Sequence, residues 1–153
     1  MDLKFTAFGI IARPVGEVFE AVVDPARLSA YFATGGAHGR LEQGARATWD
    51  FADFPGAFPV EVVEVVRDER IVLRWGLDDD PHRPEGAVET EVTMLFTDTG
   101  DGRTRIEIGE SGWPETQAGL DMSYGNCMGW SHFICLLKVW IEHGIRLRDG
   151  FYK

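Results

Sequence analysis

The chain has 153 residues, of which 44% are hydrophobic and 26% charged, as expected for a single globular domain with its own core. Acidic residues outnumber basic ones by 25 to 15, which gives a formal net charge of -10. An acidic surface repels phosphate backbones and anionic lipids, and no basic run occurs, so the composition argues against a nucleic-acid partner. With no repeat or linker, we expect one domain over residues 1–153.

The ends of the chain and its apolar stretches bear on location. The first residues, MDLKFTAFGII, lack the charged and apolar regions of a secretion signal. The longest uncharged run, Met122 to Leu137, is too short and too polar to cross a bilayer. These features predict a cytoplasmic protein that does not insert into membranes.

The N-terminal part predicts one strand and two short helices. Residues 3–12 favour a strand that ends at Arg13-Pro14. Apolar residues recur at helical spacing through PVGEVFEAVVDP, and Asp24-Pro25 separates this helix from a second one that runs to Phe32. The following ATGGAHG predicts a flexible loop.

From residue 45 onward the hydrophobic period changes to two, which indicates strands. Alternation runs through residues 45–51, 60–65, 71–75, 88–96 and 104–108. A slip in phase between Val62 and Val63 predicts a β-bulge, and TDTGDG predicts a hairpin turn. Short connections between successive strands indicate an antiparallel sheet with one buried face.

The last predicted element is a long helix that starts at about Pro114 or beyond and stops at Gly144. One broad apolar face is formed by Trp130, Phe133, Ile134, Leu137, Trp140 and Ile141. Such a face must cover something apolar, and the buried face of the sheet is the available partner. The sequence therefore predicts an α+β protein with a long helix on an antiparallel sheet.

The cysteines and histidines of this helix do not form a convincing reactive site. Cys127 and Cys135 are eight residues apart, roughly 12 Å along a helix, which is too far for a disulfide. His132 and Cys135 could touch one ion, but zinc needs three or four converging ligands. We expect no metal, and we expect the thiols to be small buried hydrophobic groups.

A second stripe of the same helix is mixed in character. It consists of His132, Leu136, Val139 and His143. Two interpretations remain open for it: a boundary between core and solvent, or the contact surface of a homodimer.

Several segments, taken together and in order, resemble one family. VGEVFEAVVDPARLSAYFA, VEVVEVVRDERIVLRW, ESGWPE and GWSHFICLLKVWIEHG match, over nearly the whole chain, the pattern of the SRPBCC (START-like) superfamily. They are most similar to its activator-of-heat-shock-protein-ATPase-homologue branch.

This resemblance implies a helix-grip fold, in which a curved antiparallel sheet of about six or seven strands wraps around the long C-terminal helix. Members of the superfamily bind lipids, steroids, polyketides or plant hormones in a cavity between sheet and helix, and a few are cyclases or hydrolases. The namesake of the branch stimulates the ATPase of a chaperone.

On this fold, large inward-facing side chains would form the wall of a cavity for a small hydrophobic molecule such as a lipid, a polyketide or an aromatic metabolite. The expected ligand-binding residues are Phe32, Trp49, Phe51, Trp75, Met94, Trp113, Trp130, Phe133, Ile134 and Leu137. The alternative is that these rings simply fill a solid core.

Catalytic residues cannot be assigned. Glu61, Glu89, Glu91 and Glu107 read as outward positions on strands, and no pair of titratable groups with opposed environments can be placed together. Glu110 and Ser111 follow the last strand and could orient a ligand at the mouth of a cavity. We therefore expect a carrier or sensor of a hydrophobic ligand, without a cofactor. The alternatives are a chaperone-associated interaction module and a cyclase- or hydrolase-like enzyme.

Overall fold

A computed structural model describes residues 1–83 and 85–153 of the chain. The strands are β1 (Leu3–Ile11), β2 (Gly36–His38), β3 (Arg46–Phe51), β4 (Phe54–Val66), β5 (Arg70–Trp75), β6 (Thr90–Asp98) and β7 (Thr104–Trp113). The helices are α1 (Val15–Val23), α2 (Pro25–Tyr31) and α3 (Gln117–His143).

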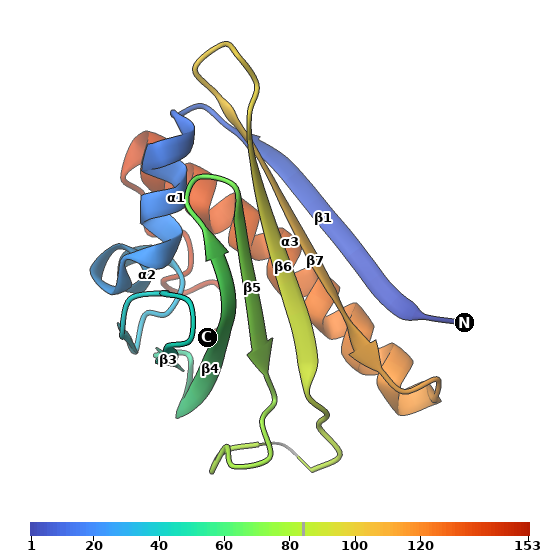
Figure 1. Cartoon of the computed structure of the whole chain (residues 1–153). Helices are drawn as coiled ribbons and strands as arrows, with labels where there is room; N and C mark the ends of the chain where they lie inside the picture. Colours follow the sequence, from blue (N-terminus) through green and yellow to red (C-terminus); the bar gives the residue numbers. More distant parts are fainter. Residues whose placement is uncertain (84) are drawn as a thin grey trace.

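The strands form one antiparallel sheet of seven strands in the order β1-β7-β6-β5-β4-β3-β2. The long helix α3 runs along one face of this sheet, and α1 and α2 lie together near its C-terminal end (Figure 1). This arrangement is a helix-grip of the α+β class, as predicted. The hairpin between β6 and β7 is also confirmed, and so is the bulge, which lies between Val62 and Glu64 where β4 pairs with β5.

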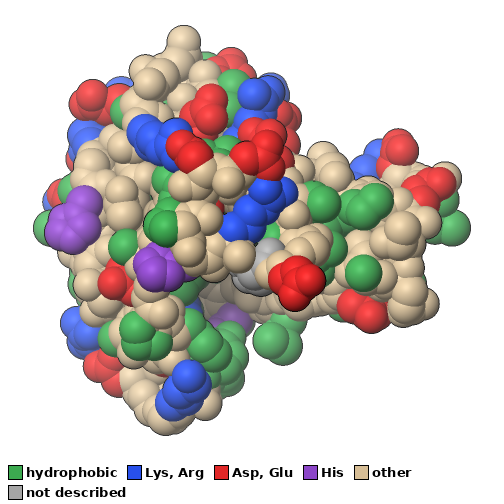
Figure 2. All heavy atoms as spheres, turned by 90° about the horizontal axis from the view of Figure 1, so that it is seen from below, with side chains coloured by type: hydrophobic (Ala, Val, Ile, Leu, Met, Phe, Trp, Pro, Cys, Tyr) green, Lys and Arg blue, Asp and Glu red, His purple; other side chains and the backbone are tan. Residues whose placement is uncertain are grey.

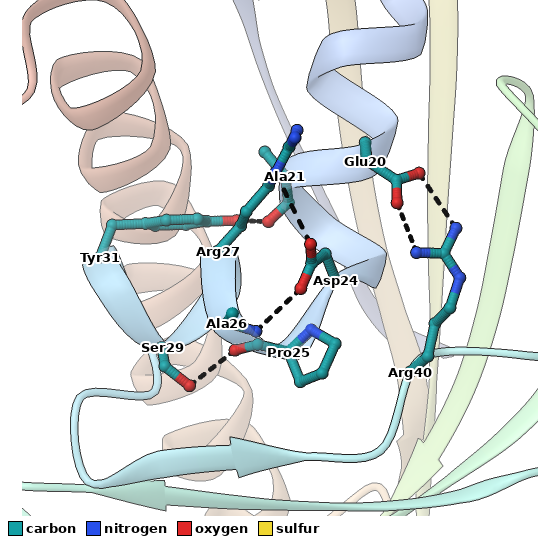
Figure 3. A network of polar contacts seen from close by, with 9 residues as sticks. All are labelled: Glu20, Ala21, Asp24, Pro25, Ala26, Arg27, Ser29, Tyr31 and Arg40. Carbon is teal, nitrogen blue, oxygen red and sulfur yellow. Dashed lines mark hydrogen bonds and ion pairs between the residues drawn. The ribbon is translucent and has the colours of Figure 1, made fainter.

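The corner between α1 and α2 is fixed by local polar contacts (Figure 3). The Asp24 carboxylate accepts a hydrogen bond of 2.9 Å from the Ala26 amide and thereby caps α2, while Pro25 occupies its first turn. The buried Tyr31 hydroxyl donates to the Ala21 carbonyl at 3.0 Å, and Glu20 of α1 forms a two-pronged ion pair with Arg40. These contacts hold α2 so that Phe32, just beyond it, reaches the core.

The end of α3 agrees with the prediction. Gly144 has a φ of 69°, in the left-handed region that glycine adopts without strain, and its amide caps the last turn of the helix. Thr116 caps the other end by accepting a hydrogen bond from the Gly119 amide.

Two predictions of detail are wrong. ATGGAHG was expected to be only a flexible loop, but residues 36–38 pair with residues 48–50 of β3 as the edge strand β2. The cysteines were expected to be buried, but Cys127 is half-buried and Cys135 exposed, since both lie off the apolar face of α3. Neither is in a disulfide.

Candidate functional site

A buried carboxylate lies at one end of the layer between sheet and helix. On β7 the inward-facing residues are Thr104, Ile106 and Ile108, and the next member of this row is Glu110, which is only 2% exposed. Its position follows from the two-residue period of the strand, which points every second side chain to the same face. A carboxylate thus occupies a place where the pattern otherwise puts aliphatic side chains.

Three donors from three different elements surround this carboxylate. Oε1 accepts hydrogen bonds from the indole N–H of Trp75 on β5, from Thr90 Oγ1 on β6 at 2.9 Å, and from Asn126 Nδ2 on α3 at 3.1 Å. Oε2 accepts from the same Asn126 amide at 3.0 Å. The polar cluster therefore ties the sheet to the N-terminal half of α3.

The environment of Glu110 acts on its ionisation in two opposing ways. Burial raises the pKa of its carboxyl above the ordinary value, while the hydrogen bonds from Trp75, Asn126 and Thr90 act to lower it. Because desolvation is the larger of these effects, the net shift is upward.

The donors of this cluster also line a cleft of about 550 Å³ at the same end of the molecule. Its aromatic walls come from Phe51, Phe54, Phe58, Trp75 and Trp113, and Met122 of α3 adds a thioether. The rim carries Asp80, His82 and Glu85 from the segment between β5 and β6. Figure 2 looks onto this end and shows a hollowed surface with hydrophobic side chains beside it.

A smaller cleft of about 280 Å³ adjoins the first. The two share Phe51, Phe54, Trp75 and Asn126 as lining residues, so these four side chains form a partition between them. The smaller cleft is completed by the residue that follows α2, by residues of α3 and by the C-terminal tail: Phe32, Gly125, Met128, Gly129, Trp130, Arg148 and Tyr152.

The residues predicted to bind a ligand fall into two groups in the structure. Phe51, Trp75 and Trp113 line the larger cleft, and Phe32 and Trp130 line the smaller one. The others lie in the packed core and line neither cleft: Trp49, Met94, Phe133, Ile134 and Leu137. Beneath the middle of α3 the space is filled by rings, such as Phe32 and Phe133 with centroids 4.7 Å apart.

The C-terminal tail, residues 145–153, is a part of the site that the sequence did not reveal. Arg148 is buried and forms a two-pronged ion pair with Asp53, with N–O distances of 2.9 and 3.1 Å. Its guanidinium carbon lies 4.3 Å from the centre of the Phe51 ring, within the range of a cation–π interaction. The tail therefore forms one wall of the smaller cleft.

The same tail covers part of the mixed stripe of α3. The ring of His132 packs against Phe151, and its Nδ1 lies 2.7 Å from the Tyr152 hydroxyl. Leu136 is buried, whereas His143 is exposed. The stripe is thus partly covered by the chain itself.

Neither a cluster of metal ligands nor a membrane-spanning helix occurs in the part of the chain that the structure describes. No group of three His, Cys, Asp or Glu side chains converges as a metal site would require in residues 1–83 and 85–153. Over the same residues, no helix combines the length and apolar character needed to cross a bilayer.

Comparison with known families identifies the chain. The family model described as "Activator of Hsp90 ATPase homolog 1-like protein" matches residues 12–142. The chain belongs to this family. Comparison with curated protein sequences gives no match.

Solved structures of other proteins share this fold. The crystal structure of DynU16, a protein in the dynemicin biosynthetic locus, is 26% identical with a TM-score of 0.76, and the match covers 95% of this chain but only 49% of DynU16. The chain thus spans about half the length of DynU16. SSP2350 from Staphylococcus saprophyticus is 23% identical over 97% of this chain and 96% of its own, with a TM-score of 0.75. The Aha1 dimer from Colwellia psychrerythraea is 18% identical over 92% of this chain and 97% of its own, also with a TM-score of 0.75.

Proposed function

We propose that this protein binds one small hydrophobic molecule with an aromatic part in the paired clefts, as a carrier or sensor. The observation that carries the proposal is that two clefts adjoin across the shared side chains of Phe51, Phe54, Trp75 and Asn126, with aromatic walls and a few convergent polar groups. A concave, mainly apolar site of roughly 300–1,000 Å³ with a small number of placed polar groups is the usual form of a small-molecule site.

The packing explains why the site lies at the end of the layer. Beneath the centre of α3, the rings of Trp130, Phe133 and Phe32 fill the space between helix and sheet. Further toward the N-terminus of α3, small and polar residues such as Gly125, Asn126 and Gly129 replace large ones. A ligand of moderate size therefore fits beside Trp75 without displacing the core.

The relatives support a small molecule as the ligand. DynU16, at 26% identity, belongs to a biosynthetic locus for dynemicin. This origin favours a role in handling an organic metabolite over a purely structural role.

Binding is tested by thermal unfolding and tryptophan fluorescence with a panel of lipids and aromatic metabolites, because a ligand that binds only the folded state raises the melting temperature. Ala87 lines the larger cleft, so Ala87→Trp should occupy part of it and reduce the shift. Thr97→Trp, at an exposed position of β6, is the matched control and should retain the shift. If no compound stabilises the wild-type protein, or if Ala87→Trp responds as the wild type does, the proposal fails.

A second candidate function rests on the family name. A protein related to an Hsp90 ATPase activator could bind a chaperone of that kind through its surface. Pull-down and ATPase assays with the chaperone test this candidate, and the absence of both binding and stimulation rejects it.

A further inference from the structure

The charged groups of the larger cleft are of one sign. Among its described lining residues, Asp80 and Glu85 are acidic and none is Lys or Arg. Behind its inner wall lies Glu110, whose three hydrogen-bond donors Trp75, Thr90 and Asn126 all belong to the lining. The charged side chains that line the cleft are therefore acidic, in the same sense as the net charge of the chain. Arg83 donates a hydrogen bond to the Ala87 carbonyl of the lining, and its guanidinium is paired with Asp78.

Glu110 has hydrogen-bond donors but no counter-ion. None of the ion pairs found among residues 1–83 and 85–153 involves it. Within residues 1–83 and 85–153, Oε2 accepts a hydrogen bond from Asn126, and the indole N–H of Trp130 also acts to lower the pKa of this carboxyl. A buried carboxylate without a cation nearby is costly, and a positive charge brought by a ligand would remove that cost.

The aromatic walls add a second attraction for a cation. The rings of Phe58 and Trp75 lie with centroids 6.0 Å apart, and Phe51 and Phe58 are 5.6 Å apart. Several ring faces close together, with carboxylates nearby, are the usual setting for recognition of quaternary ammonium and other organic cations. An anionic ligand would meet the negative faces of the same rings and is disfavoured.

The smaller cleft does not reverse this preference. Its one lining cation, among the described residues, is Arg148, and that guanidinium is neutralised by Asp53 and covered by the Phe51 ring. No free positive charge is therefore left there to attract an anion.

We propose that the ligand of this site is a hydrophobic cation, an amine or quaternary ammonium attached to an aromatic or aliphatic body, with its positive charge in the larger cleft near Glu110, Asp80 and Glu85. This inference rests on the proposed function, since it names the chemical class of the ligand for the same site.

The experiment compares two probes of equal shape, (2-phenylethyl)trimethylammonium and its neutral carbon isostere 3,3-dimethylbutylbenzene, by tryptophan fluorescence titration of the full chain. We expect the cation to bind with a dissociation constant about tenfold lower, which corresponds to a cation–π and charge contribution of about 1.4 kcal/mol. 2-Phenylethanesulfonate, the anionic counterpart, should bind more weakly than either.

Substitutions of the acidic residues test which of them cause the preference for the cationic probe over the neutral one. Glu110→Gln removes the buried charge at nearly constant shape and should lower the ratio of the two dissociation constants to about threefold or less. The Asp80→Asn/Glu85→Gln double variant changes only the rim, so it supplies an independent result if Glu110→Gln does not fold. Glu69→Gln, in the exposed turn between β4 and β5, removes one charge away from the cleft and should leave the ratio unchanged.

The outcomes separate the two proposals. If the neutral isostere binds the wild-type protein as tightly as the cation, the ligand class is wrong and the proposed function stands. A preference for the cation that persists unchanged in both acidic-to-amide variants also overturns the inference, because it then arises elsewhere. If neither probe nor any other compound binds, the proposed function itself fails.

Discussion

The indole N–H of Trp75 donates a hydrogen bond to the carboxylate of Glu110, 35 positions further along the chain. One residue is a wall of both clefts, and the other is a buried acid behind that wall. The orientation of the ring that divides the clefts is therefore set by a charged group that a ligand would not need to touch.

Replacement of Trp75 by Phe tests this relationship. The variant keeps an aromatic ring but removes one of the three hydrogen bonds to Oε1 of a buried carboxylate, which should lower the free energy of unfolding by about 1–3 kcal/mol. Urea denaturation measures this effect. Trp113→Phe is the matched control, because Trp113 lines the same cleft but is not among the donors to Glu110. This variant should lower the free energy of unfolding clearly less than Trp75→Phe does. Equal losses in the two variants would show that the hydrogen bond contributes nothing specific.

The free energy of unfolding should depend on pH through the titration of Glu110. Its pKa is raised by burial above the ordinary value of 4.5, so the folded state holds the proton more tightly than the unfolded state does. The corresponding stabilisation is fully present below pH 4.5 and is lost as pH rises through the pKa of the folded state.

The Glu110→Gln variant isolates this contribution. The difference in unfolding free energy between wild type and variant should change in favour of the variant as pH increases from 4.5, and become constant above the folded-state pKa. Urea denaturation at a series of pH values gives the difference directly. If the difference in unfolding free energy is independent of pH, or changes in favour of the wild type as pH rises, the pKa of Glu110 is not raised.

The fold could be predicted because its signals are periodic and long. The alternation along β6 and β7 and the apolar stripe of α3 each repeat several times, and their faces must meet. Glu110 was within reach of the same logic, since the alternation of Thr104, Ile106 and Ile108 continues directly to it. Asn126 lies four residues before Trp130, so extending the apolar stripe by one turn would have brought it to the inner face.

Other parts of the site had no such signal. The pairing of Asp53 with Arg148 joins residues 95 positions apart. One lies in the two-residue turn between β3 and β4 and the other in the tail after α3, and neither the turn nor the tail has a hydrophobic period of its own. The strand β2 has only three residues and begins with a glycine, which is typical of a loop. Whether inward-facing rings leave a cleft or fill the space depends on rotamers and on the curvature of the sheet, which a periodic pattern does not encode.

The contact between β1 and α3 leaves no room for a side chain at Gly9. A Cβ atom there would lie 2.7 Å from Cγ2 of Ile134, so Gly9→Ala should destabilise the fold by about 1–3 kcal/mol. Ile134→Leu removes the branch that carries Cγ2 at constant volume, and it should restore part of the loss in the double variant. Chemical denaturation of the two single variants and the double variant gives the coupling free energy between positions 9 and 134.

A glycine in an open part of α3 should behave in the opposite way. A Cβ atom at Gly129 meets nothing within 4 Å, so Gly129→Ala should stabilise the helix by up to about 1 kcal/mol. If Gly9→Ala were as harmless as Gly129→Ala, β1 and α3 could not be packed as closely as the structure shows.

The C-terminal tail should depend on the buried ion pair between Arg148 and Asp53. Arg148→Met leaves a carboxylate that is only 11% exposed without its partner, and the expected loss of stability is about 3–5 kcal/mol. The Asp53→Asn/Arg148→Met double variant should lose less, because no unpaired charge then remains buried.

The neighbouring pair of Arg146 and Asp149 provides the control within the same tail. Its side chains are 48% and 56% exposed, so solvent screens the attraction, and Arg146→Met should change stability by less than about 0.5 kcal/mol.

Limited proteolysis adds a local measurement: cleavage after residue 144 should become faster in Arg148→Met and stay slow in Arg146→Met. Because Arg148 and Tyr152 line the smaller cleft, Arg148→Met should also weaken binding of a hydrophobic probe, whereas Arg146→Met should not. Equal protease resistance in the two variants would mean that the aromatic contacts of Phe151 and Tyr152 hold the tail without the ion pair.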